Sequence, residues 1–516
     1  MTTNRRQFLQ TGLFGAAAAA TPHLFAALAP GRARALNELP TVAMIGLGLQ
    51  GRGLLNQFLG QKCIVKIVCD CDRVRREDAL RRVHAYYENH KDLGIPKDAC
   101  KAESDFRKII DDPTIDMVCV ATPDHWHAYM VVEAMKHGKD VYCEKPLTYS
   151  VDEARTIVEV ANKTGRILQT GAMQRSSYEF RAACEMVRNG LIGKVKYVEN
   201  QFGGPACPRR PFKDFKKWES EGAPNPDCDF NMWLGAAPDV PYSDQLAPRG
   251  VHNFFPGFWR EDDFFGSGGC GDWGAHHMDI TQWGMGKDGT GPVKVIASTE
   301  GRHWAWDRGF RRQSGAKLVY ADGLELLHVG GTRWGTVFFG DRGAVCVDRG
   351  RFALWTGDAS RFGTDRKVRA ALSDGTFDGL KKIAYYNGKY DKTIAGVKKQ
   401  FDTASKEFGM SALHAIKLAE DRVGFKVKEF KEHLYESRNQ VQNFVACVTQ
   451  RKDTISNHQV GPWTSVLCQL VHMSYLHDTG FDWDPAKMTF ANGTGNKDWL
   501  SRVEVRPDTG KYKVKA

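Results

Sequence analysis

The chain has 516 residues, of which 42% are hydrophobic and 26% are charged. This length excludes a single small domain and predicts two or more domains with an ample hydrophobic core. Its 72 lysines and arginines outnumber its 61 aspartates and glutamates. No basic stripe interleaved with aromatic residues accompanies this excess, so we expect no nucleic-acid partner.

The first 35 residues predict a signal peptide that is removed from the mature protein. A twin-arginine motif at Arg5-Arg6 precedes an apolar stretch through Ala16–Ala20, and Ala33-Arg34-Ala35 offers a small-x-small cleavage site. The alternative is a membrane anchor, but the apolar run is short against the roughly 20 residues that a spanning helix needs. We therefore expect a periplasmic or otherwise exported protein without a stable membrane anchor.

This export route bears on any cofactor. Proteins addressed to the twin-arginine pathway cross the membrane already folded, often with a cofactor inside. Free nicotinamide nucleotide is scarce outside the cytoplasm, so an exported nucleotide-binding enzyme is expected to keep its cofactor bound between turnovers.

Strands and helices alternate through residues 36–170. The apolar runs predict strands at 41–45, 64–69, 116–121 and 140–143, and helices from about residue 52, over 73–90 and over 128–136. Short strands alternating with helices indicate a parallel, doubly wound sheet of the Rossmann type.

A glycine-rich turn, Gly46-x-Gly48-x-x-Gly51, lies between the first strand and its helix. Gly46 permits the tight turn, Gly48 lets the backbone approach a pyrophosphate, and Gly51 lets the helix pack closely. The N-terminus of that helix would supply amide donors to the phosphates. This context makes the motif a strong indication of a dinucleotide site.

Asp70 ends the second strand and follows the last glycine of the motif by about 20 residues. An acidic residue at this spacing typically accepts hydrogen bonds from the adenosine ribose. A carboxylate at this place repels a 2′-phosphate, which favours NAD over NADP. Arg73 and Arg75 lie nearby and keep NADP possible.

Cys143-Glu144-Lys145-Pro146 follows the last of these strands. A lysine just past the carboxyl end of a buried parallel strand lies at the crevice where open α/β sheets bind their ligands. Proline fixes the backbone and removes a donor, so the strand ends there. The segment thus predicts a proton-handling side chain beside a nicotinamide ring.

Residues 171–516 form the second predicted domain. Strand-like patterns occur at 195–201, 293–298 and 337–347, and helical patterns at 411–420 and 438–451. In the last of these, Val441, Phe444, Val445 and Val448 share one face.

The 13 cysteines predict no disulfide framework, because their number is odd and their spacing irregular. Cys69, Cys119 and Cys143 lie in apolar strands, where a free thiol packs as a small hydrophobe. Cys207 and Cys228 could pair within one loop. Cys69 and Cys71 lack the paired spacing of a zinc site.

Six ordered motifs resemble the glucose–fructose oxidoreductase and inositol dehydrogenase family, Gfo/Idh/MocA. They are residues 46–53, 122–127 (Thr-Pro-Asp-His-Trp-His), 138–147, 169–176, 189–195 and 268–279 (Gly-Gly-Cys-Gly-Asp-Trp-Gly-Ala-His-His-Met-Asp). The resemblance implies a C-terminal α+β domain on a large, mostly antiparallel sheet. It also implies a dimer or tetramer packed through the open face of that sheet.

Residues 357–431 look like an insertion relative to the family core. They would cover the active site, mediate assembly or bind a partner. The region from 361 to 431 carries 16 Lys and Arg against 9 Asp and Glu, which indicates a solvated helical surface or an anionic partner.

The resemblance assigns roles residue by residue. Lys145, Asp272 and His276 match the family's catalytic lysine, aspartate and histidine. Cofactor contacts are implied for the glycines and Asp70 above, together with Arg52, Thr122, Pro123, His127, Glu144 and Lys145. Gln174, Arg175, Trp259 and Arg260 are candidates for a sugar pocket, because aromatic faces stack on sugar rings and arginine donates to hydroxyls or carboxylates, although a structural role is an equal alternative for each. His277 is a further candidate for a substrate contact.

Asp272 and His276 lie four residues apart, which places both side chains on one face if the segment is helical. Removing hydride from an alcohol carbon also requires the hydroxyl proton to leave, and a histidine suits that role. We expect His276 to be the base, Lys145 to stabilise the oxygen, and Asp272 to orient the histidine. His276, His277 and Asp279 could instead suggest a metal site, but adjacent histidines point to different helix faces, so none is predicted.

His125 and His127 lie after a parallel strand, where ligand contacts gather, although loop packing and helix capping are equal alternatives. Trp126 is expected to form a wall near the nicotinamide.

The sequence favours an NAD(P)-dependent oxidoreductase that oxidises a secondary hydroxyl of a sugar, glycoside or cyclitol. A second hypothesis is an NAD-dependent glycosidase or lyase, in which transient oxidation at C3 makes the hydrogen on C2 acidic and permits elimination. A sugar-binding protein with a vestigial nucleotide is the third, and the intact set of Lys145, Asp272 and His276 argues against it.

Overall fold

The computed structural model describes residues 39–206, 224–251, 258–299, 314–330, 335–359, 380–386, 411–502 and 512–516. The predicted signal peptide, Cys207 and most of the predicted insertion lie outside these ranges. Residues 39–516 form one compact unit.

Six parallel strands form the first sheet, in the order β3-β2-β1-β4-β5-β6. They are β1 (Thr41–Ile45), β2 (Ile64–Cys69), β3 (Lys101–Glu103), β4 (Met117–Val120), β5 (Asp140–Cys143) and β6 (Leu168–Thr170). This is the strand order of the doubly wound dinucleotide-binding fold, so the predicted Rossmann-type sheet is confirmed. The sequence did not predict β3 and β6, because three residues are too few to show a pattern.

Alternate residues of β1 face opposite layers of helices. Val42 and Met44 pack toward α1 (Leu49–Leu59), α2 (Arg73–Asn89) and α13 (Gln440–Gln450). Ala43 and Ile45 pack toward α3 (Phe106–Asp111), α4 (Asp124–Lys136) and α5 (Val151–Thr164). A parallel sheet covered on both faces explains why these strands are continuously apolar.

The second sheet has ten strands in the order β14-β13-β12-β11-β7-β10-β9-β8-β15-β16. They are β7 (Val195–Phe202), β8 (Lys294–Ile296), β9 (Lys317–Val319), β10 (Glu325–Gly330), β11 (Thr336–Gly340), β12 (Gly343–Asp348), β13 (Arg351–Thr356), β14 (Lys381–Tyr386), β15 (Phe481–Asp484) and β16 (Thr489–Phe490). Its described strand pairs are antiparallel except β7 with β10. The large, mostly antiparallel sheet is therefore confirmed.

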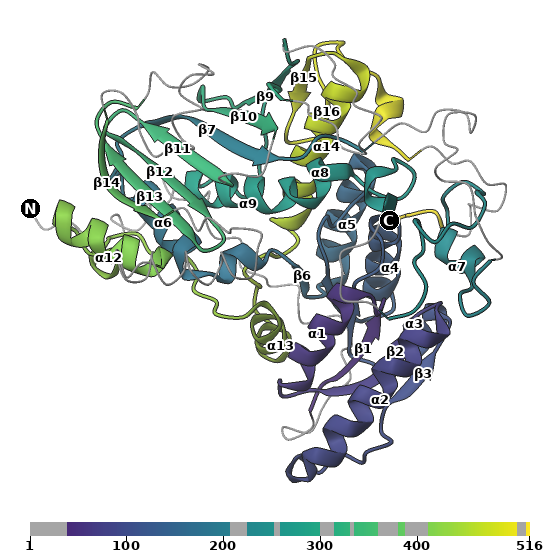
Figure 1. Ribbon diagram of the computed structural model, residues 1–516. Helices are drawn as coiled ribbons and strands as arrows, with labels where there is room; N and C mark the ends of the chain where they lie inside the picture. The colour runs from purple at the N-terminus through teal and green to yellow at the C-terminus, as the bar shows by residue number, and fades with distance from the viewer. Residues whose placement is uncertain are drawn as a thin grey trace, which may run out of the picture. The chain divides into compact units, whose positions relative to one another are not determined.

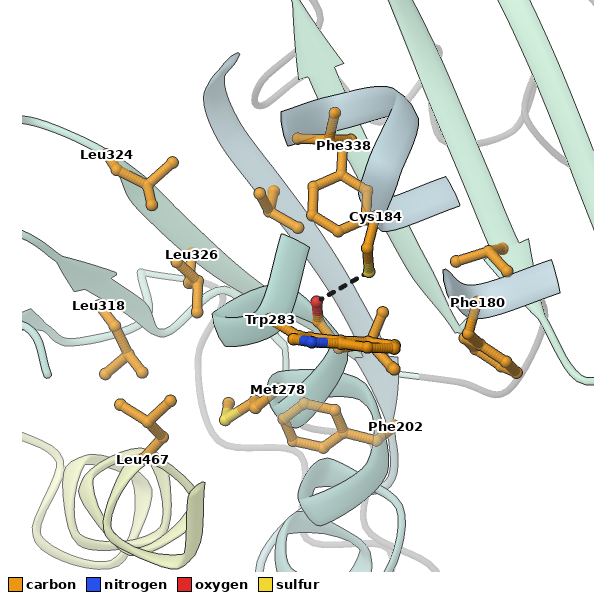
Figure 2. Packing of buried hydrophobic residues seen from close by; sticks show 14 of the residues in the cluster. Phe180, Cys184, Phe202, Met278, Trp283, Leu318, Leu324, Leu326, Phe338 and Leu467 are labelled. Atoms are coloured by element: carbon orange, nitrogen blue, oxygen red, sulfur yellow. Dashed lines mark hydrogen bonds between the residues drawn. The ribbon is translucent and has the colours of Figure 1, made fainter. Parts of the chain in front are cut away.

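Three long helices cover one face of this sheet: α6 (Tyr178–Arg188), α9 (Gly274–Met285) and α14 (Gly461–His477). Figure 2 shows the contact, with Met278 and Trp283 of α9 between Phe338 of the sheet and Leu467 of α14. An added Cβ at Gly284 would meet the Phe338 ring at 2.7 Å, so glycine lets the helix lie directly on the sheet.

The opposite face carries its own buried cluster, which includes Tyr197, Val337, Phe339 and Trp355. These side chains are buried within the single chain. The packing of a second subunit on this side of the sheet stays a prediction.

The described part of the predicted insertion extends the second sheet. β14 adds an edge strand beside β13, and α12 (Ala412–Val423) packs on both (Figure 1). Ala415, Ile416 and Ala419 of α12 are buried in the domain core, which explains the helical pattern of this segment.

Two short helices, α7 (Phe230–Leu234) and α8 (Gly268–Asp272), complete the described α-helices, with 3-10 turns at Lys91–Leu93, Met173–Ser176, Phe258–Glu261, Val427–Glu429 and Lys497–Leu500. Within the described ranges, no helix has the length and apolar character needed to cross a membrane.

Candidate functional site

A pocket lies at the carboxyl ends of the strands of the first sheet, where Gly46 follows β1, Asp70 follows β2, Thr122 follows β4 and Lys145 follows β5. β1 and β4 are neighbours whose connections run in opposite directions, so this is the switch point at which such sheets bind nucleotides. The predicted site residues that line it are Gly46, Gly48, Asp70, Thr122, Pro123, His127, Glu144, Lys145, Trp259, Arg260, Asp272 and His276.

The glycine turn has the geometry that a dinucleotide requires. Gly46 has a φ of +86°, and an added Cβ there would lie 2.6 Å from the carbonyl oxygen of Ala121. An added Cβ at Gly51 would lie 1.9 Å from the carbonyl oxygen of Gly46, so α1 reaches the turn only because residue 51 has no side chain. Gly48 lines the pocket, and an added Cβ there would meet nothing within 4 Å. This open space is the cradle that a pyrophosphate would fill.

Helix α1 begins at Leu49, three residues before the expected start at Arg52. Its N-cap is Gly48, and no side chain caps it, so the amides of its first turn are free to meet a phosphate. Leu49 and Gln50 line the pocket, whereas Arg52 and Gly51 do not. The first turn of α1 therefore meets the pocket through Leu49 and Gln50, and the predicted cofactor contact of Arg52 is not supported.

Asp70 ties the end of β2 to the glycine turn. One carboxylate oxygen accepts from the amide of Leu47 at 2.7 Å and the other from the amide of Asp72 at 2.9 Å. Arg73 is ion-paired with Asp227 at 2.7 Å, and Arg75 donates to the carbonyl oxygens of Pro248 and Gly250. Both guanidinium groups thus already have partners in the protein, which agrees with NAD.

Lys145 and Asp272 meet in the pocket although 127 residues separate them. The Lys145 ammonium donates to the carboxylate of Asp272 and, at 3.1 Å, to its carbonyl oxygen. Both side chains are mostly buried. The lysine past β5 of the first domain is thereby held by the end of α8 in the second.

His276 lies in the same pocket but not in this ion pair. Burial and then the charge of Lys145 hold its pKa well below the usual histidine value, so the ring is neutral at pH 7. Its Nδ1 is buried without a hydrogen-bond partner. Burial opposes ionisation of Asp272, but Lys145 and Arg260 outweigh it and keep the pKa of that carboxyl below its usual value.

Two details of the predicted trio are corrected. Asp272 was expected to orient His276, but its carboxylate bonds Lys145 instead. The two residues were expected on one helix face, yet the helix is interrupted at Trp273, with Asp272 ending α8 and His276 in α9. An ammonium attracts a buried carboxylate more strongly than a neutral imidazole does, which explains the pairing.

Two predicted cofactor residues support the floor of the pocket. The ring nitrogens of His127 lie 2.7 Å from the carbonyl oxygen of Pro146 and 2.9 Å from that of Thr122. The imidazole therefore links the segments that follow β4 and β5. Glu144 accepts from Gln50 of α1 at 2.9 Å. His127 and Glu144 thus fix the pocket wall as well as lining it.

The pocket lining also includes three charged or aromatic side chains to which the sequence assigned no role. Asp124 opens α4, and its buried carboxyl has a pKa that burial raises to about 7. Trp273 lies between α8 and α9, and the Arg349 guanidinium lies 4.8 Å from its ring centroid. Asp124 and Trp273 stood inside recognised motifs, but Arg349 follows β12, and no local signal brings that turn to the pocket.

Three predicted substrate residues do not line the pocket. Arg175 is wrong as a sugar contact, because its side chain is only 2% exposed and its guanidinium is ion-paired with Asp279 and Asp288. Gln174 is likewise buried. The Nδ1 of His277 donates to the carbonyl oxygen of Gln201 at 2.7 Å, and the ring faces the sheet. Residue type does not fix the direction in which a side chain points, and for Gln174 and Arg175 the structural alternative applies.

A segment of the second domain covers the outer end of the pocket. We call residues 224–251 the strap. Met232, Trp233, Leu246, Ala247 and Pro248 of the strap line the pocket beside Asp70 and Arg75. The carbonyl oxygen of Trp233 lies 2.9 Å from Nε2 of His125 and accepts from Trp126 at 3.0 Å. His125 therefore has a packing role, and Trp126 is a wall residue of the pocket.

The strap also places one of the cysteines named above. Cys228, which could pair with Cys207, packs in one cluster with Cys71 of the first domain, whereas Cys207 lies outside the described residues. Among the residues that the structure describes, no group of three or more His, Cys, Asp or Glu side chains could hold a metal ion.

Comparisons with known proteins agree with this architecture. Residues 41–172 match a family model described as "Oxidoreductase family, NAD-binding Rossmann fold", and residues 213–344 match one described as "Oxidoreductase family, C-terminal alpha/beta domain". Both are models of the GFO/IDH/MocA family, and together they span about half of the chain.

Two relatives and one solved structure illustrate the similarity. scyllo-Inositol 2-dehydrogenase (NAD(+)) of Bacillus subtilis (strain 168) is 31% identical over 158 residues, 30% of this chain and 42% of that protein. A glycosyl hydrolase family 109 protein of Shewanella pealeana is 28% identical over 215 residues, 39% of this chain and 46% of that protein. A levoglucosan dehydrogenase solved with NADH and L-sorbose shares the fold, with a TM-score of 0.50, 15% identity, and 87% and 100% of the two chains covered.

The chain spans less than half the length of the two curated relatives it matches. The parts that match are nevertheless those that build the pocket: the whole parallel sheet with its glycine turn, and a large part of the domain that supplies Asp272 and His276. This protein belongs to the Gfo/Idh/MocA family of NAD-binding oxidoreductases.

Proposed function

We propose that this protein is an exported NAD-dependent oxidoreductase that oxidises a secondary hydroxyl of a sugar, glycoside or cyclitol. The observation that carries the proposal is the meeting of Lys145, Asp272 and a neutral His276 in the pocket that holds the glycine turn. Relatives named as inositol dehydrogenases support the substrate class.

The chemistry follows from the charges in the pocket. When NAD is bound, its nicotinamide ring supplies the hydride acceptor. His276, kept neutral by burial, accepts the hydroxyl proton. Lys145, held by Asp272, supplies the positive charge that stabilises the oxygen as it loses that proton.

The part of the pocket beside this trio suits a polyhydroxylated ring. Trp259 and Trp273 offer aromatic faces, and Arg260 and Arg349 offer guanidinium donors. Aromatic faces stack on sugar rings, and arginine donates to hydroxyl oxygens. We propose these four side chains as the substrate contacts, in place of Gln174, Arg175 and His277.

Replacement of Lys145 tests the proposal. Lys145→Ala should lower the rate of cofactor reduction by about 10²-fold or more, because the developing oxygen charge loses the ammonium that Asp272 holds in the pocket. Bound nucleotide, measured by absorbance after denaturation, should stay as in the wild type. Lys97→Ala, at an exposed position, is the control. Unchanged turnover in Lys145→Ala would reject the assignment.

A second candidate is an NAD-dependent glycosidase or lyase. Oxidation at C3 makes the C2 hydrogen acidic, a base removes it, the glycosidic oxygen leaves, and the ketone is reduced again. Such a cycle needs a further proton-transfer group, and Asp124, with a pKa of about 7, lies in the same pocket. Relatives named glycosyl hydrolase family 109 proteins also favour it.

Mass spectrometry of products distinguishes the candidates. The protein as purified is incubated with a panel of glycosides and cyclitols. A product lighter by two hydrogens supports net oxidation, and a cleaved glycoside of unchanged redox state supports elimination. Saturable sugar binding without either product would contradict both and support a binding protein.

We also propose export through the twin-arginine pathway and assembly as a homo-oligomer. Arg5-Arg6 and the apolar run after it support export. A double Arg5→Lys, Arg6→Lys variant should remain in the cytoplasm, as measured by cell fractionation. Light scattering during size-exclusion chromatography measures the assembly, and a monomer mass would reject the oligomer.

A further inference from the structure

The strap is fastened to the outer end of the cofactor pocket by several polar contacts. Asp227 pairs with Arg73, the side chain of Asn225 donates to Asp72 at 3.2 Å, and the amide of Arg73 donates to the carbonyl oxygen of Asp227 at 2.7 Å. Its far end is held by Arg75, which donates to Pro248 and Gly250. All these partners lie at the start of α2, directly after Asp70.

Two cysteines meet at this junction. The amide of Asp229 donates to the carbonyl oxygen of Cys71 at 3.1 Å, and Asp72 pairs with Cys228 in an antiparallel bridge. Cys71 and Cys228 pack against the same hydrophobic cluster, and the Cys228 thiol and burial raise the pKa of Cys71. The bridge brings the backbones of residues 71–72 and 228–229 side by side, and a disulfide needs Cα atoms about 4.4–6.8 Å apart.

Neither cysteine has a role in the proposed reaction. Cys71 lines the pocket beside Asp70, while Cys228 belongs to the strap, and both are partly exposed free thiols. The other described cysteines are buried. The pair is therefore placed where a bond would join the first domain to the strap.

We propose that Cys71 and Cys228 form a reversible disulfide that locks the strap over the adenosine end of the cofactor. The oxidant is a small or protein disulfide, R–S–S–R. One cysteine sulfur attacks it and releases RSH, and the second cysteine then displaces the other R–SH. Two protons and two electrons pass to the oxidant, and one S–S bond forms in the protein.

The neighbouring Cys228 thiol and burial raise the pKa of Cys71 well above its usual value, so Cys71 keeps its proton near neutral pH. Either sulfur can attack the oxidant first, and the other then closes the bond.

The lock suits a protein that folds in one compartment and works in another. In a reducing compartment the thiols stay free, and the strap can open to admit the cofactor. In an oxidising compartment the disulfide forms and retains a nucleotide that is scarce there. This step rests on the proposed export and cofactor site, whereas bond formation itself depends on neither.

Bond formation is tested on the folded holoprotein. The protein is purified with a thiol reductant, exchanged into oxidised glutathione, blocked with iodoacetamide and digested without reduction. We expect one cross-linked peptide pair containing Cys71 and Cys228, absent after dithiothreitol. Failure to detect it while both peptides carry iodoacetamide would overturn the proposal, whatever the enzyme's activity.

Cofactor retention is tested by the rate at which bound NAD exchanges into excess labelled NAD. Oxidation should slow this exchange about tenfold or more in the wild type, because a cross-link that closes a loop disfavours opening. Cys228→Ser should show the fast rate in both states. Cys447→Ala, on α13 away from the strap, should behave as the wild type.

The wild-type comparison holds even if a variant fails to fold. Equal exchange rates in reduced and oxidised wild type, with the cross-link present, would overturn the locking role. Absence of any bound or exchanging NAD would instead contradict the proposed cofactor site, so the two failures are distinguishable.

Discussion

At the scale of single residues, the decisive finding is which charge each buried group meets. Lys145 and Asp272 come from different domains and pair with one another, and Nδ1 of His276 is buried without a partner. Burial and then the charge of Lys145 lower the pKa of His276 and keep its ring neutral. A neutral imidazole beside a fixed cation can accept a proton but gains little by keeping it.

This protonation state predicts a pH profile. A base with an ordinary histidine pKa loses activity as the pH falls through about 6.5. Because the pKa of His276 is held well below that value, we expect kcat/KM to persist below pH 6. The profile should be measured for the wild type and for Asp124→Asn, since Asp124 titrates near pH 7. A loss near pH 6.5 that remains in Asp124→Asn would contradict a neutral, buried His276.

Arg175 illustrates the opposite kind of buried charge. Its guanidinium lies between Asp279 and Asp288 and has no access to the pocket. Arg175→Met should lower the free energy of unfolding by about 3–5 kcal/mol, because a buried carboxylate loses its counter-charge. Urea denaturation measures the loss. Asp288→Asn, at a position 34% exposed, should lower the free energy of unfolding by less. An equal loss in both variants would contradict the role of the buried pair of Arg175 with Asp279.

At the scale of elements, the site is built from the ends of strands and helices. The carboxyl ends of four parallel strands, the first turn of α1 and the break between α8 and α9 all meet at the pocket. Elements with a long apolar pattern were predicted within a few residues, because burial on both faces leaves a continuous signal. The three-residue strands were missed, since so short a run shows no periodicity.

The glycine turn gives a matched pair of variants in one element. Gly51→Ala places a Cβ against the carbonyl oxygen of Gly46, whereas Gly53→Ala meets nothing within 4 Å. We expect Gly51→Ala to weaken NAD binding at least about tenfold by displacing α1, and Gly53→Ala to leave it within about twofold, because Gly53 is an exposed helix position. Isothermal titration of the stripped protein measures both. Equal affinities would mean that the turn does not hold the nucleotide.

At the scale of the whole molecule, a helix from the C-terminal part of the chain completes the first domain. Helix α13 lies against α1, and its Val441, Phe444, Val445 and Val448 are buried in the core of the first sheet (Figure 1). The predicted apolar face is confirmed, but its partner is a helix almost 400 residues earlier. The predicted domain at 36–170 therefore lacks one covering helix of its own sheet.

This dependence predicts a stability effect far from the site. Phe444→Ala should lower the free energy of unfolding by about 3–5 kcal/mol, because a large cavity opens beneath the sheet. Gln442→Ala, on the exposed face of the same helix, should change it by less than about 0.5 kcal/mol. Thermal or urea unfolding measures both. A fragment of residues 39–170 should fail to unfold cooperatively, and cooperative unfolding of that fragment would contradict the role of α13.

The sequence by itself determined the features that local pattern encodes. The alternating strands and helices, the glycine turn with Asp70, and the lysine after the fourth long strand follow from periodicity and from steric rules that act over a few residues. These features were enough to predict the parallel sheet and its dinucleotide pocket.

Only the tertiary structure decided which distant groups meet. It paired Lys145 with Asp272, turned Arg175 and His277 away from the pocket, brought Arg349 to it, and set Cys71 beside Cys228. Such pairs depend on how two sheets and the strap pack together, and the energy of a buried charge depends on neighbours that sequence order does not reveal.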